Sequence, residues 1–231
     1  MTLLITVHWS LTAEMTTLIT LTDPRSQAAE AFRTLRTNLT FSSLENPLTT
    51  LLVTSPSDDG DVASGKSVTL ANLAITFAQG GKKTILVDCD LRRPMQHELW
   101  NVSNERGLSE FIQEGGKLSL QNVSVDGLSL LTSGVLPSAP ADLISSTKMA
   151  KAIAALKAKA DIVLFDAPPV VAVTDAALLA SKLDGVLLVI SAGHTKRDHA
   201  AQAKELLEKI KVRIVGTVLT NAPTDASVKS Y

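Results

Sequence analysis

Short apolar runs alternate with amphipathic stretches along most of this chain. The apolar runs are typical of buried strands and cover residues 51–53, 84–90, 127–132, 161–166, 184–190 and 213–219. Between them, apolar residues recur at helical spacing, which predicts helices at about 26–42, 68–78, 107–112, 141–159, 173–182 and 196–209. Strands that alternate with helices predict one α/β domain, built on a doubly wound, mostly parallel sheet.

The two ends of the sequence carry weaker patterns. Residues 1–23 are rich in Thr and Leu and give no clear assignment, so we treat them as an uncertain N-terminal extension before a domain at 24–220. The segment 221–231 is short and polar, and we expect it to be a flexible tail.

Composition narrows the class of protein. The chain has 231 residues, of which 45% are hydrophobic, enough for a substantial core. Its formal net charge is −1 and only 3% of residues are aromatic, so nucleic acid is not an expected partner. The single cysteine, Cys89, rules out an internal disulfide and fits a cytoplasmic protein. No apolar run approaches the ~18 residues that a membrane span needs.

A phosphate-binding motif lies between the first buried strand and the helix that follows it. Two glycines with four residues between them, Gly60 and Gly65, precede Lys66 and Ser67. Backbone amides at a helix N-terminus attract phosphate, the lysine neutralises it and the hydroxyl can ligate Mg²⁺. A chance glycine-rich turn is the alternative, but the strand and helix around the motif favour ATP or ADP binding. The predicted nucleotide contacts are Gly60, Ser64, Gly65, Lys66, Ser67 and Val68.

Acidic residues end two of the predicted strands. Asp88 and Asp90 follow one apolar run, and Asp166 ends another. Ligands of open α/β sheets bind at the carboxyl ends of the strands, so these carboxylates are candidates for holding Mg²⁺ or a water beside the phosphate loop. Ordinary turn chemistry at a strand end is the alternative.

The first predicted helix carries three charged residues at a spacing of three, namely Glu30, Arg33 and Arg36. They share one arc of the helix surface. By spacing alone, a solvated stripe with an internal ion pair is the simpler interpretation.

Four segments together resemble the bacterial tyrosine kinases, the P-loop kinases of capsule and exopolysaccharide production. The segment ILVDCDLRRP resembles their Walker A′ motif, and FDAPPVVAVTDA resembles their Walker B strand with the helix after it. Glu30, Arg33 and Arg36 match the Glu-x-x-Arg-x-x-Arg helix through which that family forms rings. The fourth segment, GLSLLTSGVLPSAPADLI, is also similar to a family segment.

This resemblance implies a P-loop fold and transfer of the ATP γ-phosphoryl group to tyrosine. Lys66, Asp88 and Asp90 would be catalytic, with Asp88 or Asp90 as the base, and Ser67, Asp88 and Asp166 would hold Mg²⁺. It also implies a homo-oligomeric ring through the Glu30 helix, protein tyrosine substrates, and a membrane polysaccharide co-polymerase that activates the kinase. The protein would then lie in the cytoplasm, at the inner face of the membrane, through that partner.

The sequence departs from the family in its loop and its tail. The phosphate loop is about four residues longer than is usual in the family and contains Asp58, Asp59 and Asp61, which would repel a triphosphate unless they face solvent or share the metal. The family usually ends in a tyrosine cluster, whereas this chain has one tyrosine, Tyr231, as a possible phosphoacceptor. Asn221 is a candidate for contacting the nucleotide base, and a turn-forming Asn is an equal alternative.

Two other functions remain open from the sequence. A nucleotide-binding, non-catalytic scaffold of the polysaccharide machinery would fit the acidic loop and the missing tyrosine cluster. A ParA/MinD-type ATPase shares the fold, but its signature lysine, five residues before the loop lysine, is replaced here by Asp61.

Overall fold

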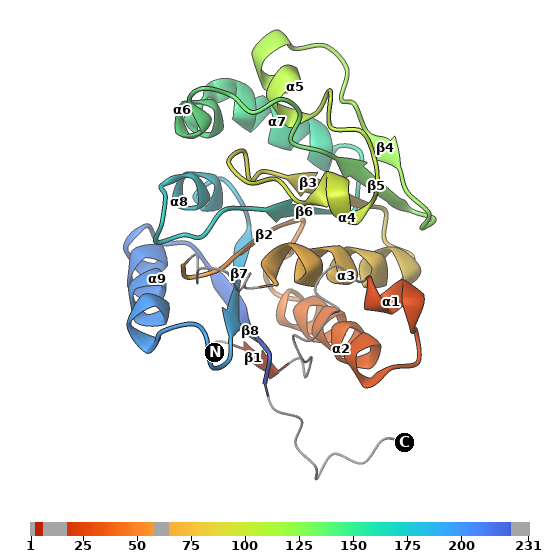
Figure 1. The fold of residues 1–231 in the computed structure, drawn as a ribbon, viewed down its shortest axis with the longest axis vertical. Coiled ribbons are helices and arrows are strands. Elements are labelled where there is room, and N and C mark those ends of the chain that lie inside the picture. The colour runs from red at the N-terminus through yellow and green to blue at the C-terminus, as the bar shows by residue number, and fades with distance from the viewer. Residues whose placement is uncertain (1–2, 7–17, 58–64, 223–231) are drawn as a thin grey trace.

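The computed structural model describes residues 3–6, 18–57 and 65–222, and within them the strands form one eight-stranded sheet (Figure 1). The strand order is β1-β8-β7-β2-β6-β3-β5-β4, and all neighbours are parallel except β4, which runs antiparallel to β5. The strand bounds are β1 Leu3–Thr6, β2 Thr50–Thr54, β3 Thr84–Asp88, β4 Gln121–Asn122, β5 Leu128–Leu131, β6 Ile162–Asp166, β7 Gly185–Ser191 and β8 Ile214–Thr220.

Helices cover both faces of this sheet, as Figure 1 shows. One face packs against α1 Ile19–Thr22, α2 Gln27–Ser42 and α3 Lys66–Gln79. The other packs against α5 Leu108–Glu114, α6 Pro140–Ser145, α7 Thr147–Lys157, α8 Asp175–Ala180 and α9 Arg197–Lys209. A single turn, α4 Gln96–Leu99, follows β3. The predicted doubly wound sheet is therefore confirmed.

The central strand shows why the apolar runs carry no alternation. In β2, Leu51 and Val53 pack in the core on the α1–α3 side, while Leu52 packs in the core on the opposite side. A strand covered on both faces has apolar residues at successive central positions, as Leu51, Leu52 and Val53 show.

Capping residues determine where α2 begins. The Ser26 side chain accepts a hydrogen bond from the Ala29 amide at 3.2 Å, as an N-cap serine does. From there Phe32, Leu35 and Leu39 are fully buried, on the face that the sequence pattern assigned to the core.

One predicted helix is wrong as a single element. The stretch predicted at 141–159 is two helices, α6 and α7, separated by Ser146. Ser146 has extended backbone (φ −59°, ψ 155°), and its side chain accepts from the Met149 amide at 3.2 Å. A serine that caps a new helix ends the preceding one, because the cap conformation is not helical.

The N-terminal segment without a sequence assignment contributes two short elements. Strand β1 pairs in parallel with β8 at the edge of the sheet. Helix α1 is tied to α3, since the Thr20 hydroxyl and amide both donate to Asn72 Oδ1, at 2.8 and 3.0 Å. Four-residue elements are too short for periodicity to reveal.

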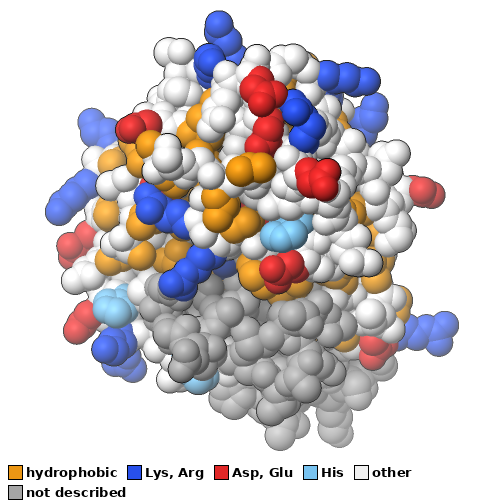
Figure 2. Space-filling model, turned by 45° about the horizontal axis from the view of Figure 1, so that its top comes forward, with side chains coloured by type: hydrophobic (Ala, Val, Ile, Leu, Met, Phe, Trp, Pro, Cys, Tyr) orange, Lys and Arg blue, Asp and Glu red, His pale blue; other side chains and the backbone are white. Residues whose placement is uncertain are grey.

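The surface mixes both charge signs. On the face shown in Figure 2, lysine and arginine side chains are interspersed with aspartate and glutamate among small hydrophobic areas. Among the described residues, no helix is long and apolar enough to cross a membrane.

Candidate active site

Lys66, the first residue of α3, lies between two carboxylates. Its ammonium is 3.0 Å from Asp90 Oδ2 and 3.1 Å from Asp166 Oδ1, and 3.3 Å from the Ser67 hydroxyl. The three charged side chains are nearly excluded from solvent, with exposed fractions of 11%, 5% and 0% for Lys66, Asp90 and Asp166. Burial lowers the pKa of Lys66, but attraction to Asp166 and Asp90 outweighs it, and the net pKa is raised.

Sheet topology brings these groups together. Strand β6 lies between β2, which leads into the phosphate loop, and β3, which leads to Asp90. Asp88 and Asp166 are paired in the register of β3 and β6, so both acids reach the same carboxyl edge of the sheet. Gly65 begins α3 with a left-handed φ of 71°, a conformation that glycine adopts without strain.

Asp88 is fully buried and held by the backbone. Its carboxylate accepts from three backbone amides: Asp90 at 3.1 Å on one oxygen, and Met95 at 3.1 Å and Gln96 at 2.9 Å on the other. Burial, followed by repulsion from Asp166, raises the pKa of Asp88 to about 8, although the Gln96 amide and Lys66 oppose this rise. Asp88 thus organises the loop after β3.

Asp90 divides its two oxygens between the loop and the lysine. Oδ1 accepts from the amides of Arg92 and Arg93, at 3.3 and 3.0 Å, and Oδ2 faces Lys66. The same loop is anchored by Arg92, whose guanidinium forms a two-pronged pair with buried Asp175 at 2.9 and 3.1 Å.

The oxygen donors at this edge fit Mg²⁺ bound together with a nucleotide. Carboxylates and a hydroxyl are the ligands Mg²⁺ prefers, and it usually takes one or two carboxylates plus phosphate oxygens. Within the described ranges, no three acidic, histidine or cysteine side chains are close enough to hold a metal by themselves. The Lys66 ammonium, a cation already seated between two carboxylates, shows that the site tolerates positive charge.

Known proteins with similar sequences and structures define the family. The model of the CobQ/CobB/MinD/ParA nucleotide binding domain matches residues 59–230. The chain is 39% identical over 204 residues to tyrosine-protein kinase YwqD of Bacillus subtilis, covering 87% of this chain and 84% of that protein. It is 33% identical over 207 residues to tyrosine-protein kinase etk of Escherichia coli K12, covering 89% of this chain but 28% of that protein. The kinase domain of Escherichia coli tyrosine kinase ETK superimposes with a TM-score of 0.87, at 29% identity, over 100% of this chain and 95% of that one.

The chain belongs to the bacterial tyrosine kinases. The chimerical protein CapA2B2 has the same fold, with a TM-score of 0.88 and 32% identity, over 96% of this chain and 95% of that one. Pyrococcus horikoshii MinD, solved with Mg-ADP, has a TM-score of 0.60 at 21% identity and shows the shared fold alone. The ParA/MinD alternative is therefore a distant fold relation, and the recognition of the tyrosine kinase family is confirmed.

The remaining predicted site residues of this kinase fall into two groups, those that the structure describes and those outside the described residues. Gly60, Ser64 and Tyr231 are in the second group, with the three loop aspartates. Val68 is buried in the first turn of α3. Asn221 has a positive φ of 57° and donates from Nδ2 to the Ser191 hydroxyl at 2.7 Å.

The three charged residues of α2 make contacts within the kinase chain. Arg33 pairs with Glu30 and also donates to the Pro24 carbonyl at 2.7 Å. Arg36 donates to the Thr76 carbonyl at 2.7 Å, near the end of α3. Glu30 remains 65% exposed.

Sequence reasoning missed two residues of this kinase site, Gln96 and Asp175. Gln96 is fully buried and donates to both Asp166 and the Ser67 carbonyl, at 2.8 and 3.1 Å. Asp175 lies in the segment that resembles the Walker B region. Because Asp175 is far from Arg92 in the sequence, no pattern indicated the ion pair between them. Only the packing of α8 against the loop after β3 reveals it.

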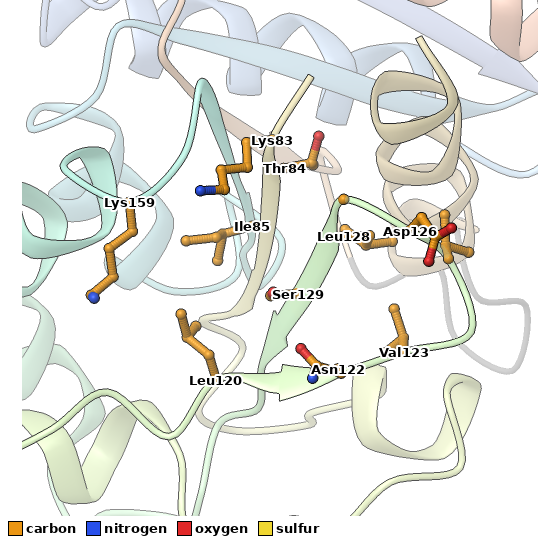
Figure 3. A pocket seen from close by; sticks show the side chains of 12 residues that line it. Lys83, Thr84, Ile85, Leu120, Asn122, Val123, Asp126, Leu128, Ser129 and Lys159 are labelled. Carbon is orange, nitrogen blue, oxygen red and sulfur yellow. The ribbon is translucent and has the colours of Figure 1, made fainter. Parts of the chain in front are cut away.

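A separate cleft of about 370 Å³ lies at the opposite, amino ends of β3 and β5 (Figure 3). Its lining includes the side chains of Lys83, Lys159, Ile85 and Leu120. The kinase site at the carboxyl ends is distinct from this cleft.

Proposed function

We propose that this kinase transfers the γ-phosphoryl group of ATP to tyrosine and regulates capsular or exopolysaccharide synthesis and export. The observation that carries the proposal is the position of Lys66, at the start of α3, between Asp90 and Asp166 at the ends of two adjacent strands. A phosphate-neutralising cation beside two carboxylates is the arrangement that Mg²⁺-dependent phosphoryl transfer requires.

In this proposal Lys66 turns from the carboxylates to the β- and γ-phosphates when nucleotide binds. Gly60, Ser64, Gly65 and Val68 would contribute their backbone amides, and Asn221 would contact the base. Ser67, Asp166 and Asp88 would hold Mg²⁺, which supplies neutralisation of the developing charge. The chain's part is mainly positioning and electrostatic stabilisation.

Between the two candidate bases, the contacts favour Asp90. Both oxygens of Asp88 accept from backbone amides, whereas Asp90 Oδ2 faces the Lys66 ammonium at 3.0 Å. Once Lys66 moves to the phosphates, Oδ2 is free to accept the tyrosine phenol proton. The phenol oxygen then bonds to the γ-phosphorus, the bond to the β-γ bridging oxygen breaks, and ADP leaves.

We further propose that the kinase works as an assembly. Glu30, Arg33 and Arg36 on α2 would contact a neighbouring subunit in a ring, and Tyr231 of one subunit would be phosphorylated by the next. A membrane polysaccharide co-polymerase would activate the kinase and hold it at the inner face of the membrane. Exposure of Glu30 supports the first of these proposals.

A nucleotide-binding scaffold without turnover is the second candidate. It is favoured by the pairing of Lys66, whose charge is already neutralised by Asp90 and Asp166. Nucleotide must compete with both carboxylates for this ammonium. A scaffold of this kind would bind ATP and Mg²⁺ but leave tyrosine unmodified.

Labelled ATP distinguishes these functions. The chain would be incubated with γ-labelled ATP, Mg²⁺ and a cytoplasmic fragment of its co-polymerase, and phosphotyrosine would be measured beside ATP binding. We expect phosphotyrosine in the native chain and its loss in Lys66→Met. ATP binding without phosphotyrosine would establish the scaffold instead, and a failure to bind ATP would overturn both.

A further inference from the structure

Gln96, the first residue of α4, joins three parts of the kinase site. Its side-chain Nε2 donates to Asp166 Oδ2 at 2.8 Å and to the Ser67 carbonyl at 3.1 Å. Its backbone amide donates to Asp88 at 2.9 Å. One buried residue therefore touches β3, β6 and the first turn of α3.

The orientation of this amide group is fixed by its partners. An ionised carboxylate and a backbone carbonyl only accept hydrogen bonds, so Nε2 must face Asp166 and Ser67. On the other side, the Trp100 indole only donates, and its Nε1 is 3.3 Å from Gln96 Oε1. A flipped amide would lose all three hydrogen bonds, and the fully buried Gln96 side chain has no water contact to replace them.

This network leaves Asp166 with one oxygen for a ligand. Oδ2 is occupied by Gln96, while Oδ1 faces the Lys66 ammonium at 3.1 Å. A carboxylate held in this way offers the same oxygen, in the same direction, to any cation that replaces the ammonium. Residues that hold a ligating group are a recurrent feature of metal sites, and their loss weakens metal binding 10–100-fold.

We propose that Gln96 is a positioning residue that fixes Asp166 as a one-oxygen ligand for Mg²⁺ bound with nucleotide. It acts through Asp166 and touches neither nucleotide nor substrate. The inference rests on the proposed nucleotide function, because the metal and the nucleotide are bound together. It adds Trp100 as a partner whose environment is coupled to the metal site.

Binding of ADP with and without Mg²⁺ tests the proposal. Titration calorimetry would compare the native chain with Gln96→Leu, which has a similar size but no donor, and with Gln96→Glu, which places an acceptor against Asp166. An exposed glutamine on α5 gives the matched control, Gln113→Leu. We expect the Mg²⁺ concentration for half-maximal ADP binding to rise about 10-fold or more in both Gln96 variants. In EDTA, their ADP affinity should stay within about twofold of the native value, and Gln113→Leu should match the native chain throughout.

The outcomes distinguish a failure of the positioning role of Gln96 from a failure of the proposed nucleotide function. An unchanged Mg²⁺ requirement in Gln96→Leu, with normal binding by the native chain, would overturn the positioning role alone. An equal loss of affinity with and without Mg²⁺ would also overturn it, since that pattern indicates a general structural defect. A native chain that binds no Mg²⁺·ADP would overturn both. If Gln96→Leu fails to fold, the same comparison is made with Gln96→Glu. If neither variant folds, a role that is specific to the metal is overturned.

Fluorescence of Trp100 gives a readout that is independent of activity. In a Trp9→Phe background, Trp100 is the single tryptophan. We expect its emission to change when Mg²⁺ is added to the ADP-bound chain, and this change to disappear in Gln96→Leu. An identical response in both chains would contradict the coupling.

Discussion

Asp88 and Asp166 lie directly opposite each other on the neighbouring parallel strands β3 and β6. Both side chains are fully buried, and the Lys66 ammonium lies 3.1 Å from Asp166 and opposes the rise in the pKa of Asp88. The sheet register therefore places two acidic groups side by side at the site where the nucleotide's metal is proposed to bind, and repulsion from Asp166 contributes to the raised pKa of Asp88. A divalent cation bound beside the two carboxylates would reduce the repulsion between them.

The first prediction concerns pH and stability. The folded pKa of Asp88, about 8, lies above its ordinary value because of burial and Asp166, so the folded chain holds a proton that the unfolded chain releases. The free energy of unfolding should therefore fall as pH rises from about 4 to about 8, with a slope of at most about 1.4 kcal/mol per pH unit. Urea unfolding at pH 5, 6, 7 and 8, without nucleotide, measures the slope.

Asp166→Asn is the control for this pH dependence. It removes the neighbouring charge, so the pKa of Asp88 should decrease and the slope between pH 6 and 8 should shrink. A slope that is the same in both chains would show that Asp88 does not titrate in this range.

The second prediction concerns the anchor of the loop after β3. Arg92→Ala leaves the buried Asp175 carboxylate without its two-pronged partner. Breaking a buried pair costs about 3–5 kcal/mol, but the Arg92 side chain is 41% exposed, so we expect about 1–3 kcal/mol of lost stability. Thermal and urea unfolding measure it.

A surface pair provides the matched control. Arg106 and Glu114 also form a close pair, but their side chains are 62% and 58% exposed. Arg106→Ala should cost much less stability than Arg92→Ala, because solvent screens a pair between exposed side chains. Equal effects of the two substitutions would contradict a special role for the Asp175 anchor.

The third prediction separates assembly from folding on α2. Glu30 is exposed, whereas Arg36 donates to the Thr76 carbonyl of α3. Glu30→Lys should reduce the oligomer without lowering the melting temperature by more than about 2 °C, since surface changes are usually within about 0.5 kcal/mol. Arg36→Ala should lower both. Light scattering after size exclusion, with melting curves, tests this, and an unchanged oligomer in Glu30→Lys would remove that residue from the interface.

The pattern of apolar and polar positions alone predicted most of the fold. The runs around Leu52, Val163 and Val186 predicted the central strands, because strands covered on both faces consist largely of apolar residues. The spacing of Phe32, Leu35 and Leu39 predicted α2 and its buried face. The elements that pattern missed, β1, α1, α4 and β4, have two to four residues, too few for any period to appear.

The chemistry of the site was only partly accessible from sequence. The acids at the strand ends could be named because parallel strands bring their carboxyl ends to one edge. The division of labour among them could not, since it depends on backbone amides that fill both oxygens of Asp88 and leave Asp90 Oδ2 to the lysine. Gln96 escaped notice because a lone glutamine after a proline and methionine carries no motif, and only its burial against Asp166 marks it.

The last prediction assigns separate roles to Asp90 and Asp166. If Asp90 accepts the phenol proton, Asp90→Asn should lower kcat about 10²–10⁴-fold while the affinity for Mg²⁺·ADP stays within a few-fold. Asp166→Asn removes a proposed metal ligand and should raise the Mg²⁺ requirement for both binding and turnover. The measurement is a Mg²⁺ titration of phosphotyrosine formation, paired with calorimetric ADP binding in the two variants.

The contrast between the variants is the test, because each substitution removes one of the two charges that hold Lys66. A shared effect through the lysine would change both variants in the same way, in nucleotide affinity and in rate. Excess Mg²⁺ should restore turnover to Asp166→Asn in part, but none to Asp90→Asn, since a metal cannot replace a proton acceptor. Recovery of Asp90→Asn at high Mg²⁺ would transfer the role of base to Asp88.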